Sequence, residues 1–80
     1  MENVAITKLR TVRLEKIKDV YKFVEEAMEV SGEVEITRGQ FCVSGTSMMG
    51  LLAIDPSESF CVEYPANAND FDAFLQKFVC

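Results

Sequence analysis

The sequence predicts an α+β fold in which helices cover one face of a single antiparallel sheet. Short segments of alternating apolar and polar side chains indicate strands with one buried face. Longer segments with apolar residues three or four positions apart indicate amphipathic helices, and the segments follow the order β-α-β-β-α-β-α. The chain has 80 residues, 49% of them hydrophobic, so we expect one domain over residues 1–80 with one modest core.

The first predicted strand is Val4–Thr7, followed by a basic connection over residues 8–13. Thr11 is the expected cap of the next helix, and Gly32 is expected to end that helix. The helix is predicted from apolar residues at the spacing of one buried face. These residues are Leu14, Ile17, Val20, Tyr21, Val24, Ala27 and Met28.

A hairpin and two further elements complete the predicted fold. Residues 33–37 alternate strictly, Arg38 and Gly39 form a turn signal, and residues 40–43 form the return strand. Residues 60–64 alternate again and are the fourth predicted strand. Asn69 is the expected cap of the last helix, with Asp70 and Asp72 in its first turn. Its apolar stripe consists of Phe71, Phe74, Leu75, Phe78 and Val79.

Residues 46–54 are predicted to form a short helix with more apolar side chains than one buried face can hold. Ser47 is its predicted N-cap, because its hydroxyl oxygen can accept from an amide of the first turn. Some of the apolar residues must therefore be exposed, and exposed methionine adapts well to a binding partner. We expect this helix to dock a protein. Its apolar residues are Met48, Met49, Leu51, Leu52 and Ile54.

The net charge of −5 is unevenly distributed along the chain. The first 22 residues contain six basic and three acidic residues, and the remainder contains two basic and ten acidic residues. The overall acidity argues against nucleic-acid binding. The basic segment favours an acidic protein partner or a phosphate, or is simply a solvated helix face. No apolar run is long enough for a membrane span or a signal peptide, so we expect a cytoplasmic protein.

The three cysteines, Cys42, Cys61 and Cys80, are widely spaced, and the chain has no histidine to complete a zinc site. We expect reduced thiols, no metal and no cofactor, and the role of Cys80 stays open. The sequence also has no carboxylate pair or nucleophile at catalytic spacing, and 80 residues leave little room for a deep cleft. The protein is therefore not expected to be an enzyme.

The element order and the run Val43-Ser44-Gly45-Thr46-Ser47-Met48-Met49-Gly50-Leu51-Leu52 resemble HPr, the histidine-containing phosphocarrier family of the bacterial sugar phosphotransferase system. The family pattern in this run is close to V-N-A-K-S-I-M-G-L-L, and the resemblance extends without a gap from about Tyr21 to Val79. It implies an open-faced sandwich, in which a four-stranded antiparallel sheet carries three helices on one face.

The family carries its phosphoryl group on a histidine in a Gly-Leu-His-Ala-Arg-Pro motif, whereas this chain has no histidine. A gapless alignment places Lys16 at the histidine position, Lys18 at the arginine position and Asp19 at the proline position. A lysine ammonium is not a nucleophile until it loses its proton, so the resemblance implies that the phosphohistidine relay is absent. This combination is similar to the HPr paralogue that regulates catabolite repression.

Ser47 matches the serine that a dedicated ATP-dependent kinase phosphorylates in Gram-positive relatives, whose phosphoserine form binds a catabolite-control regulator. A phosphate there would add nearly two negative charges at the N-terminus of a helix. Thr46 stands where the family has a basic residue before the serine. The resemblance also implies a partner-binding surface, which consists here of Met48, Met49, Leu51, Lys16 and Lys18.

The predicted function is a regulatory or protein-binding module without catalytic activity. Its expected partners are proteins, including an HPr kinase and a catabolite-control regulator, with no nucleic acid, membrane or metal. Two alternatives stay open. One is a phosphocarrier that uses a nucleophile other than histidine. The other is a structural or assembly protein whose methionine patch and acidic surface bind another protein constitutively, and in either case Ser47 could serve only as a helix cap.

Overall fold

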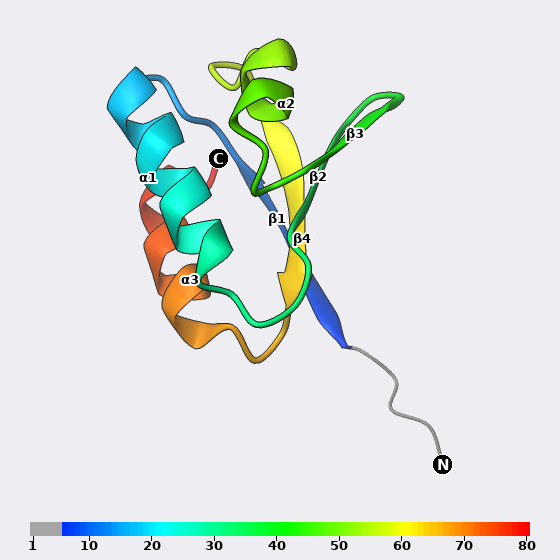
Figure 1. The fold of residues 1–80 in the computed structure, drawn as a ribbon, viewed down its shortest axis with the longest axis vertical. Helices are drawn as coiled ribbons and strands as arrows, with labels where there is room; N and C mark the ends of the chain where they lie inside the picture. The colour runs from blue at the N-terminus through cyan, green and yellow to red at the C-terminus, as the bar shows by residue number, and fades with distance from the viewer. Residues whose placement is uncertain (1–5) are drawn as a thin grey trace.

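The computed structural model describes residues 6–80, which form a four-stranded antiparallel sheet with three α-helices on one face (Figure 1). In sheet order the strands are β1 (Thr7–Val12), β4 (Phe60–Pro65), β2 (Glu35–Arg38) and β3 (Phe41–Ser44). The helices are α1 (Ile17–Met28), α2 (Met48–Ala53) and α3 (Asn69–Leu75), and a 3₁₀ turn follows at Gln76–Phe78. The predicted α+β open-faced sandwich is confirmed.

β1 lies where a basic connection was predicted. The predicted bounds Val4–Thr7 are wrong: the strand begins at Thr7, and residues 4 and 5 lie outside the described residues. Lys8 and Arg10 alternate with exposed positions and point to the helix side of the sheet, where both lie near Asp72 of α3. The strand pairs along its whole length with β4, from Thr7 opposite Pro65 to Val12 opposite Phe60.

Both predicted ends of α1 are wrong. The N-cap is Lys16, in an extended conformation, and Thr11 lies within β1. The C-cap is Glu29, and Gly32 lies beyond it in the loop that leads to β2. Gly32 adopts φ 136°, and a Cβ at this position would lie 2.9 Å from Cγ of Pro65. This glycine is therefore required by the loop and not by the helix end.

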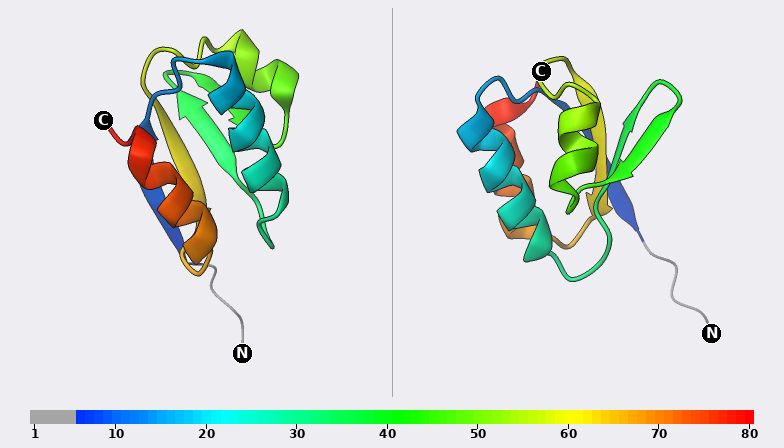
Figure 2. Two further views of the ribbon diagram at one scale, coloured as in Figure 1. Left: turned by 90° about the vertical axis from the view of Figure 1, so that its left-hand side faces the viewer. Right: turned by 45° about the horizontal axis from the view of Figure 1, so that its top comes forward.

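α1 is rotated relative to its predicted packing. Phe23, which the predicted apolar face omits, is fully buried and packs edge-to-face on Phe60 and Phe71, at centroid distances of 6.1 and 5.5 Å. Three residues predicted to be buried are more than half exposed instead: Ile17, Tyr21 and Met28. Residues two apart on a helix point about 200° apart, so Tyr21 lies almost opposite Phe23. Because Phe23 faces α3, this exposed flank lies on the side of α2 (Figure 2).

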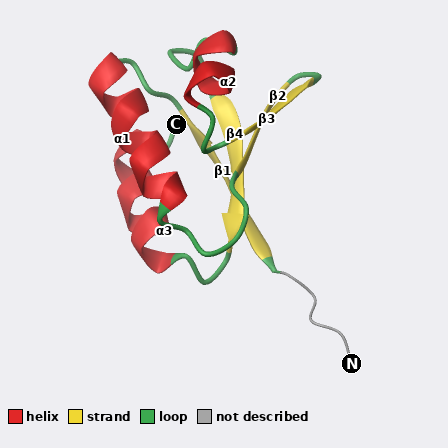
Figure 3. Ribbon diagram, in the orientation of Figure 1, coloured by secondary structure: helices red, strands yellow, loops and turns green. Residues whose placement is uncertain are grey.

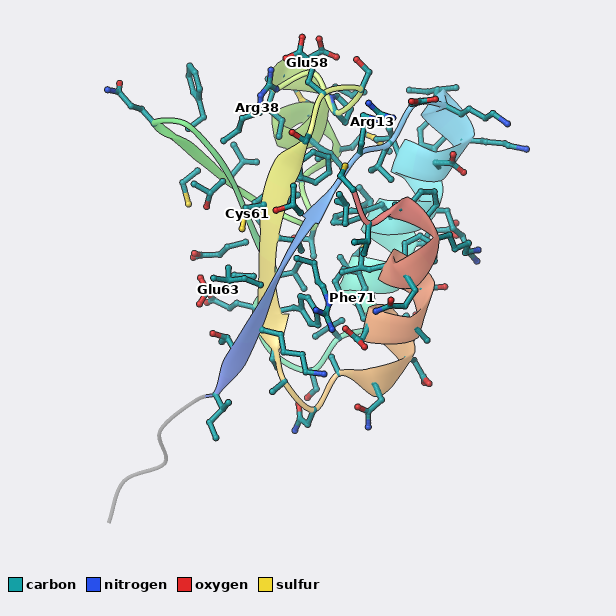
Figure 4. The ribbon with its side chains drawn as sticks, turned by 180° about the vertical axis from the view of Figure 1, so that it is seen from behind. Arg13, Arg38, Glu58, Cys61, Glu63 and Phe71 are labelled. Carbon is teal, nitrogen blue, oxygen red and sulfur yellow. The ribbon has the colours of Figure 1, made fainter. Side chains whose placement is uncertain are left out.

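The central strand β4 separates the two faces of the sheet. Phe60, Val62 and Tyr64 are buried under the helices, whereas Cys61 and Glu63 point to the open face (Figure 4). The β2–β3 hairpin turns at residues 39 and 40, and Gly39 has φ 60°, as predicted for a tight turn.

The last helix is confirmed, but its predicted cap is wrong. Asn69 is its first helical residue, and the N-cap is Ala68, whose methyl group cannot form a capping hydrogen bond. The carboxylates of residues 70 and 72 lie in the first turn, as predicted. Val79 is 44% exposed and forms an isolated bridge with Val12 instead of extending the apolar stripe. Within residues 6–80, no helix is both long enough and apolar enough to span a bilayer.

Candidate functional site

Ser47 caps α2 as predicted. Its backbone is extended, at φ −102° and ψ 107°, and its Oγ accepts a hydrogen bond from the amide of Gly50 at 3.0 Å. The carbonyl of the same residue accepts from Leu51 at 3.0 Å, and its amide donates to the carbonyl of Ser44 at 3.1 Å. The hydroxyl group therefore lies at the start of a helix, half-buried, with its oxygen already engaged.

The packing of α2 decides which of its apolar residues are available to a partner. A Cβ on Gly50 would lie 3.1 Å from Cβ of Val43, so this glycine allows the helix to approach β3 closely. Leu51 is fully buried in the core, and its predicted role as an exposed contact residue is wrong. Met48 is half-buried and packs against the core, whereas Met49 is 84% exposed.

Four exposed apolar side chains from two helices form the α1–α2 surface, which we define as Ile17, Tyr21, Met49 and Leu52. α1 and α2 contact each other, and Figure 3 shows them on the same face of the sheet. Sequence reasoning assigned Ile17 and Tyr21 to the core. The signal that could have found them is the width of the apolar face of α1, since seven residues exceed what one sheet-facing stripe needs.

Lys16 and Lys18 flank this surface at the start of α1, and both are exposed. The carbonyl of Lys16 accepts from the amides at positions 19 and 20, at 3.0 and 3.2 Å, so the backbone begins the helix while its side chain stays free of the cap. Within residues 6–80, no hydrogen bond joins either lysine to Ser47.

The start of α1 lies near the C-terminal end of α2, not near Ser47. The amide of Leu14 donates to the carbonyl of Pro56 at 2.8 Å, which anchors the β1–α1 connection to the loop after α2. Ser47 lies at the opposite end of α2, directly before its first residue. The structure thus places the two lysines and the serine at different ends of one surface.

A second polar cluster joins β1, β4 and α3 beneath the helices. The hydroxyl of Tyr64 donates to Oδ1 of Asp72, Arg10 Nε lies 3.4 Å from the same oxygen, and Lys8 Nζ lies 3.9 Å from Oδ2. Burial, followed by the bond to the carboxylate, raises the pKa of Tyr64 to about 12. The Tyr64 bond, followed by the charges of Lys8 and Arg10, lowers the pKa of Asp72. The neighbouring hydroxyl of Tyr64, followed by the charge of Asp72, raises the pKa of Arg10.

The thiols lie away from the α1–α2 surface. Thr37 of β2 is the cross-strand partner of both Cys42 and Cys61, and Cys61 also pairs with Thr11. The amide of Cys80 donates to the carbonyl of Thr11 at 2.9 Å. The three free cysteines thus lie at the same level of the sheet, in a line that crosses the strands. Cys61 points to the open face, opposite the helices (Figure 4). Among residues 6–80, no group of His, Cys, Asp or Glu side chains is arranged to hold a metal ion.

A hollow of about 770 Å³ lies at the opposite end of the sheet from α2. It is lined by carboxylates and apolar side chains, among them Glu33, Glu35, Glu63, Ile6 and Pro65. Glu63 accepts a hydrogen bond from the hydroxyl of Thr7 at 2.7 Å. None of the predicted site residues lines this hollow.

Comparison with known proteins supports the fold and does not show a family. No family model and no curated protein sequence matches the chain. The crystal structure of a phosphocarrier protein HPr from Bacillus anthracis is similar over 95% of this chain and 99% of that chain, with a TM-score of 0.71 and 18% sequence identity. The protein therefore has the HPr-like fold, a four-stranded antiparallel sheet with three helices on one face.

Proposed function

We propose that this protein is a non-catalytic, HPr-like regulatory module of the bacterial cytoplasm that binds other proteins through the α1–α2 surface. The observation that carries the proposal is the exposure of four apolar side chains on two adjacent helices, beside Lys16 and Lys18. Exposed apolar side chains that gather on one face of a soluble fold are typical of protein-binding sites. The three free thiols agree with a reducing compartment.

The proposal assigns regulation to Ser47. A phosphate on its Oγ would stand beside Met49 and carry nearly two negative charges into a surface whose other exposed members are apolar. A partner with a purely apolar contact patch would be disfavoured, and a partner with an arginine or lysine would be favoured. The absence of histidine supports a regulatory role over a phosphoryl relay.

Phosphorylation of Ser47 is tested by incubation with an HPr kinase and ATP, followed by mass spectrometry. The expected result is one added phosphate on the peptide that contains Ser47, and none on the Ser47→Ala variant. An ordinary HPr in the same tube is the positive control. Phosphate on the control protein but none on this one would refute the regulatory role of the serine.

Docking is tested separately with Met49→Asp, because this side chain is 84% exposed and its replacement should leave the fold intact. The matched control is Leu9→Asp, which alters an exposed leucine on the open face of the sheet. Binding of a catabolite-control regulator, measured by calorimetry, should fall at least about tenfold for Met49→Asp and stay unchanged for Leu9→Asp. Equal losses in both variants, or no loss in either, would rule out the α1–α2 surface.

The second candidate is a constitutive assembly protein, and the Ser47–Gly50 hydrogen bond favours it, since a helix cap alone accounts for the serine. In that case binding would survive Ser47→Asp and would be lost in Met49→Asp. A phosphocarrier role predicts instead a labelled protein after incubation with phosphoenolpyruvate and enzyme I. We expect no label, because the histidine position holds Lys16 and Cys61 points to the opposite face of the sheet.

A further inference from the structure

The two edges of the sheet are protected to different degrees. Beside β1, Val79 bridges Val12, and the amide of Cys80 donates to Thr11, so the C-terminal residues cover part of that edge. This strand also carries Lys8 and Arg10, and edge lysines and arginines oppose pairing with another chain. β3 is the other edge, and within residues 6–80 its only sheet neighbour is β2. It belongs to the hairpin that projects beyond the helices in Figure 1.

β3 is only four residues long, but it lacks the charged side chains, prolines and bulges that protect most edge strands. Residues 39–54 contain no charged residue and no proline, so the nearest charges along the chain are Arg38 and Asp55. The strand is regular and carries Phe41, whose side chain is 68% exposed. Uncharged, regular edges of this kind pair readily with another strand.

The hairpin geometry fixes which peptide groups face outward. The residues that flank a two-residue turn form a hydrogen-bonded pair, here Arg38 and Phe41, and hydrogen-bonded pairs alternate along an antiparallel ladder. Phe41 and Val43 therefore direct their peptide groups toward β2. Cys42, between them, directs its amide and carbonyl toward the free edge.

The side chains of β3 are complementary to a second copy of the same strand. With Cys42 opposite Cys42 of the second copy, each Phe41 lies opposite the other copy's Val43, on the helix side of the sheet. Aromatic and β-branched residues form favourable cross-strand pairs. Val43 is half-buried and lies close to α2, since a Cβ on Gly50 would be 3.1 Å from its Cβ, so Phe41 would pack at a position that is already partly apolar. A shift by two residues in one direction would place Phe41 opposite Gly45, without an apolar contact. A shift in the other direction would pair Phe41 with Phe41 but Val43 with Gly39, so one apolar pair would replace two.

We propose that the protein forms a homodimer through antiparallel pairing of β3 with β3 of a second copy, around a two-fold axis at Cys42. The occupant of the edge is a second copy because the pattern of Phe41 and Val43 is complementary to itself, as two-fold interfaces require. Because β3 has no charged side chain, its pairing with a second copy brings no like charges together. The result is an eight-stranded sheet with all helices on one face, and it is independent of the function proposed above.

The oligomeric state tests this directly. Sedimentation velocity of the full chain, from micromolar to millimolar concentration at physiological salt, should show a monomer–dimer equilibrium. Phe41→Glu should raise the dimer dissociation constant at least about tenfold, since it places a carboxylate opposite Val43 in both symmetry-related pairs. The matched control is Leu9→Glu on β1, at 60% exposure, which should leave the dimer unchanged. Cys42→Lys is a second test, because it brings two ammonium groups together at the axis.

Cross-linking locates the axis. Cα atoms of a hydrogen-bonded antiparallel pair lie about 5.5 Å apart, within reach of a short bismaleimide. A variant that keeps only Cys42 should therefore be cross-linked to a dimer. A variant that keeps only Cys61 should not, because five strand spacings of about 4.8 Å would separate its thiols.

A monomer at all concentrations would overturn the proposal. A dimer that survives Phe41→Glu and Cys42→Lys, with both variants folded by circular dichroism, would also overturn it. Loss of the dimer in Leu9→Glu would assign the contact to β1 instead.

Discussion

Tyr64 of the central strand and Asp72 of α3 share a hydrogen bond on which both of their pKa shifts depend. The tyrosine side chain is fully buried, and the carboxylate is 21% exposed. The bond therefore joins the sheet to a helix at a point where Arg10 and Lys8 also converge. It couples the stability of the fold to pH at both ends of the scale.

At high pH the tyrosine controls the expected loss of stability. Its pKa is 10.0 when unperturbed and about 12 in the fold, so its contribution is complete below pH 10 and is lost as the pH rises toward 12. This loss amounts to about 3 kcal/mol. The free energy of unfolding, measured in urea between pH 10 and 12, should show this loss in the wild type and not in Tyr64→Phe. Tyr21→Phe, at an exposed site, is the control and should behave as the wild type.

At low pH the expected loss of stability depends on the carboxylate of Asp72. The pKa of Asp72 lies below its ordinary value of 3.8, so its contribution is present above that value and is lost as the pH falls through the folded pKa. Asp72→Asn should cost about 1 kcal/mol at neutral pH and should flatten the decline of stability in acid. Asp70→Asn, at an exposed position in the same turn, should retain the wild-type decline. Identical acid profiles for the two variants would contradict this account.

Gly45 is expected to be the least replaceable residue of the β3–α2 connection. A Cβ there would lie 2.5 Å from Cγ1 of Val34 and 3.1 Å from its carbonyl oxygen, which accepts from the amide of Gly45. Gly45→Ala should therefore lower the free energy of unfolding by about 2 kcal/mol, measured by urea titration. Gly39→Ala meets no atom within 4 Å and has only its φ of 60° to overcome, so it should cost about 1 kcal/mol.

Two neighbours on α2 should separate stability from binding. Leu51→Ala removes a fully buried side chain and should cost about 3 kcal/mol of unfolding free energy. Met49→Ala removes an 84% exposed side chain and should change stability by less than about 0.5 kcal/mol, measured by thermal and urea unfolding. A large loss in Met49→Ala would mean that α2 packs through a different face.

The sequence predicted the order of the elements but misplaced β1. Its alternation is hidden because Lys8 and Arg10 occupy helix-side positions, where apolar residues were expected. Their charges are compensated by Asp72, which is distant in sequence, and local patterns do not reveal such a partner. The cap at Ser47 and the turn at Gly39, in contrast, depend on neighbouring residues and were predicted correctly.

The sequence predicted that α2 exposes apolar side chains, but it did not predict correctly which ones. This choice also depends on contacts that are distant in sequence. A helix of six residues has too few positions for periodicity to choose its buried face. The close approach of Gly50 to Val43 makes that choice, and it buries Leu51 while exposing Met49. On α1 the aromatic contacts of Phe23 set the rotation, which exposes Tyr21.

The pairing of β1 with β4 has a consequence for how the protein folds during synthesis. β1 lies near the start of the chain, yet within the described residues its partners are β4 and the C-terminal segment, both from the last third. The hairpin and α2 can form from neighbouring residues, but β1 must wait until nearly the whole chain has left the ribosome. Until β4 has emerged, β1 and the β4-facing side of β2 are unpaired, so a chaperone that binds extended segments would have its best opportunity at this stage.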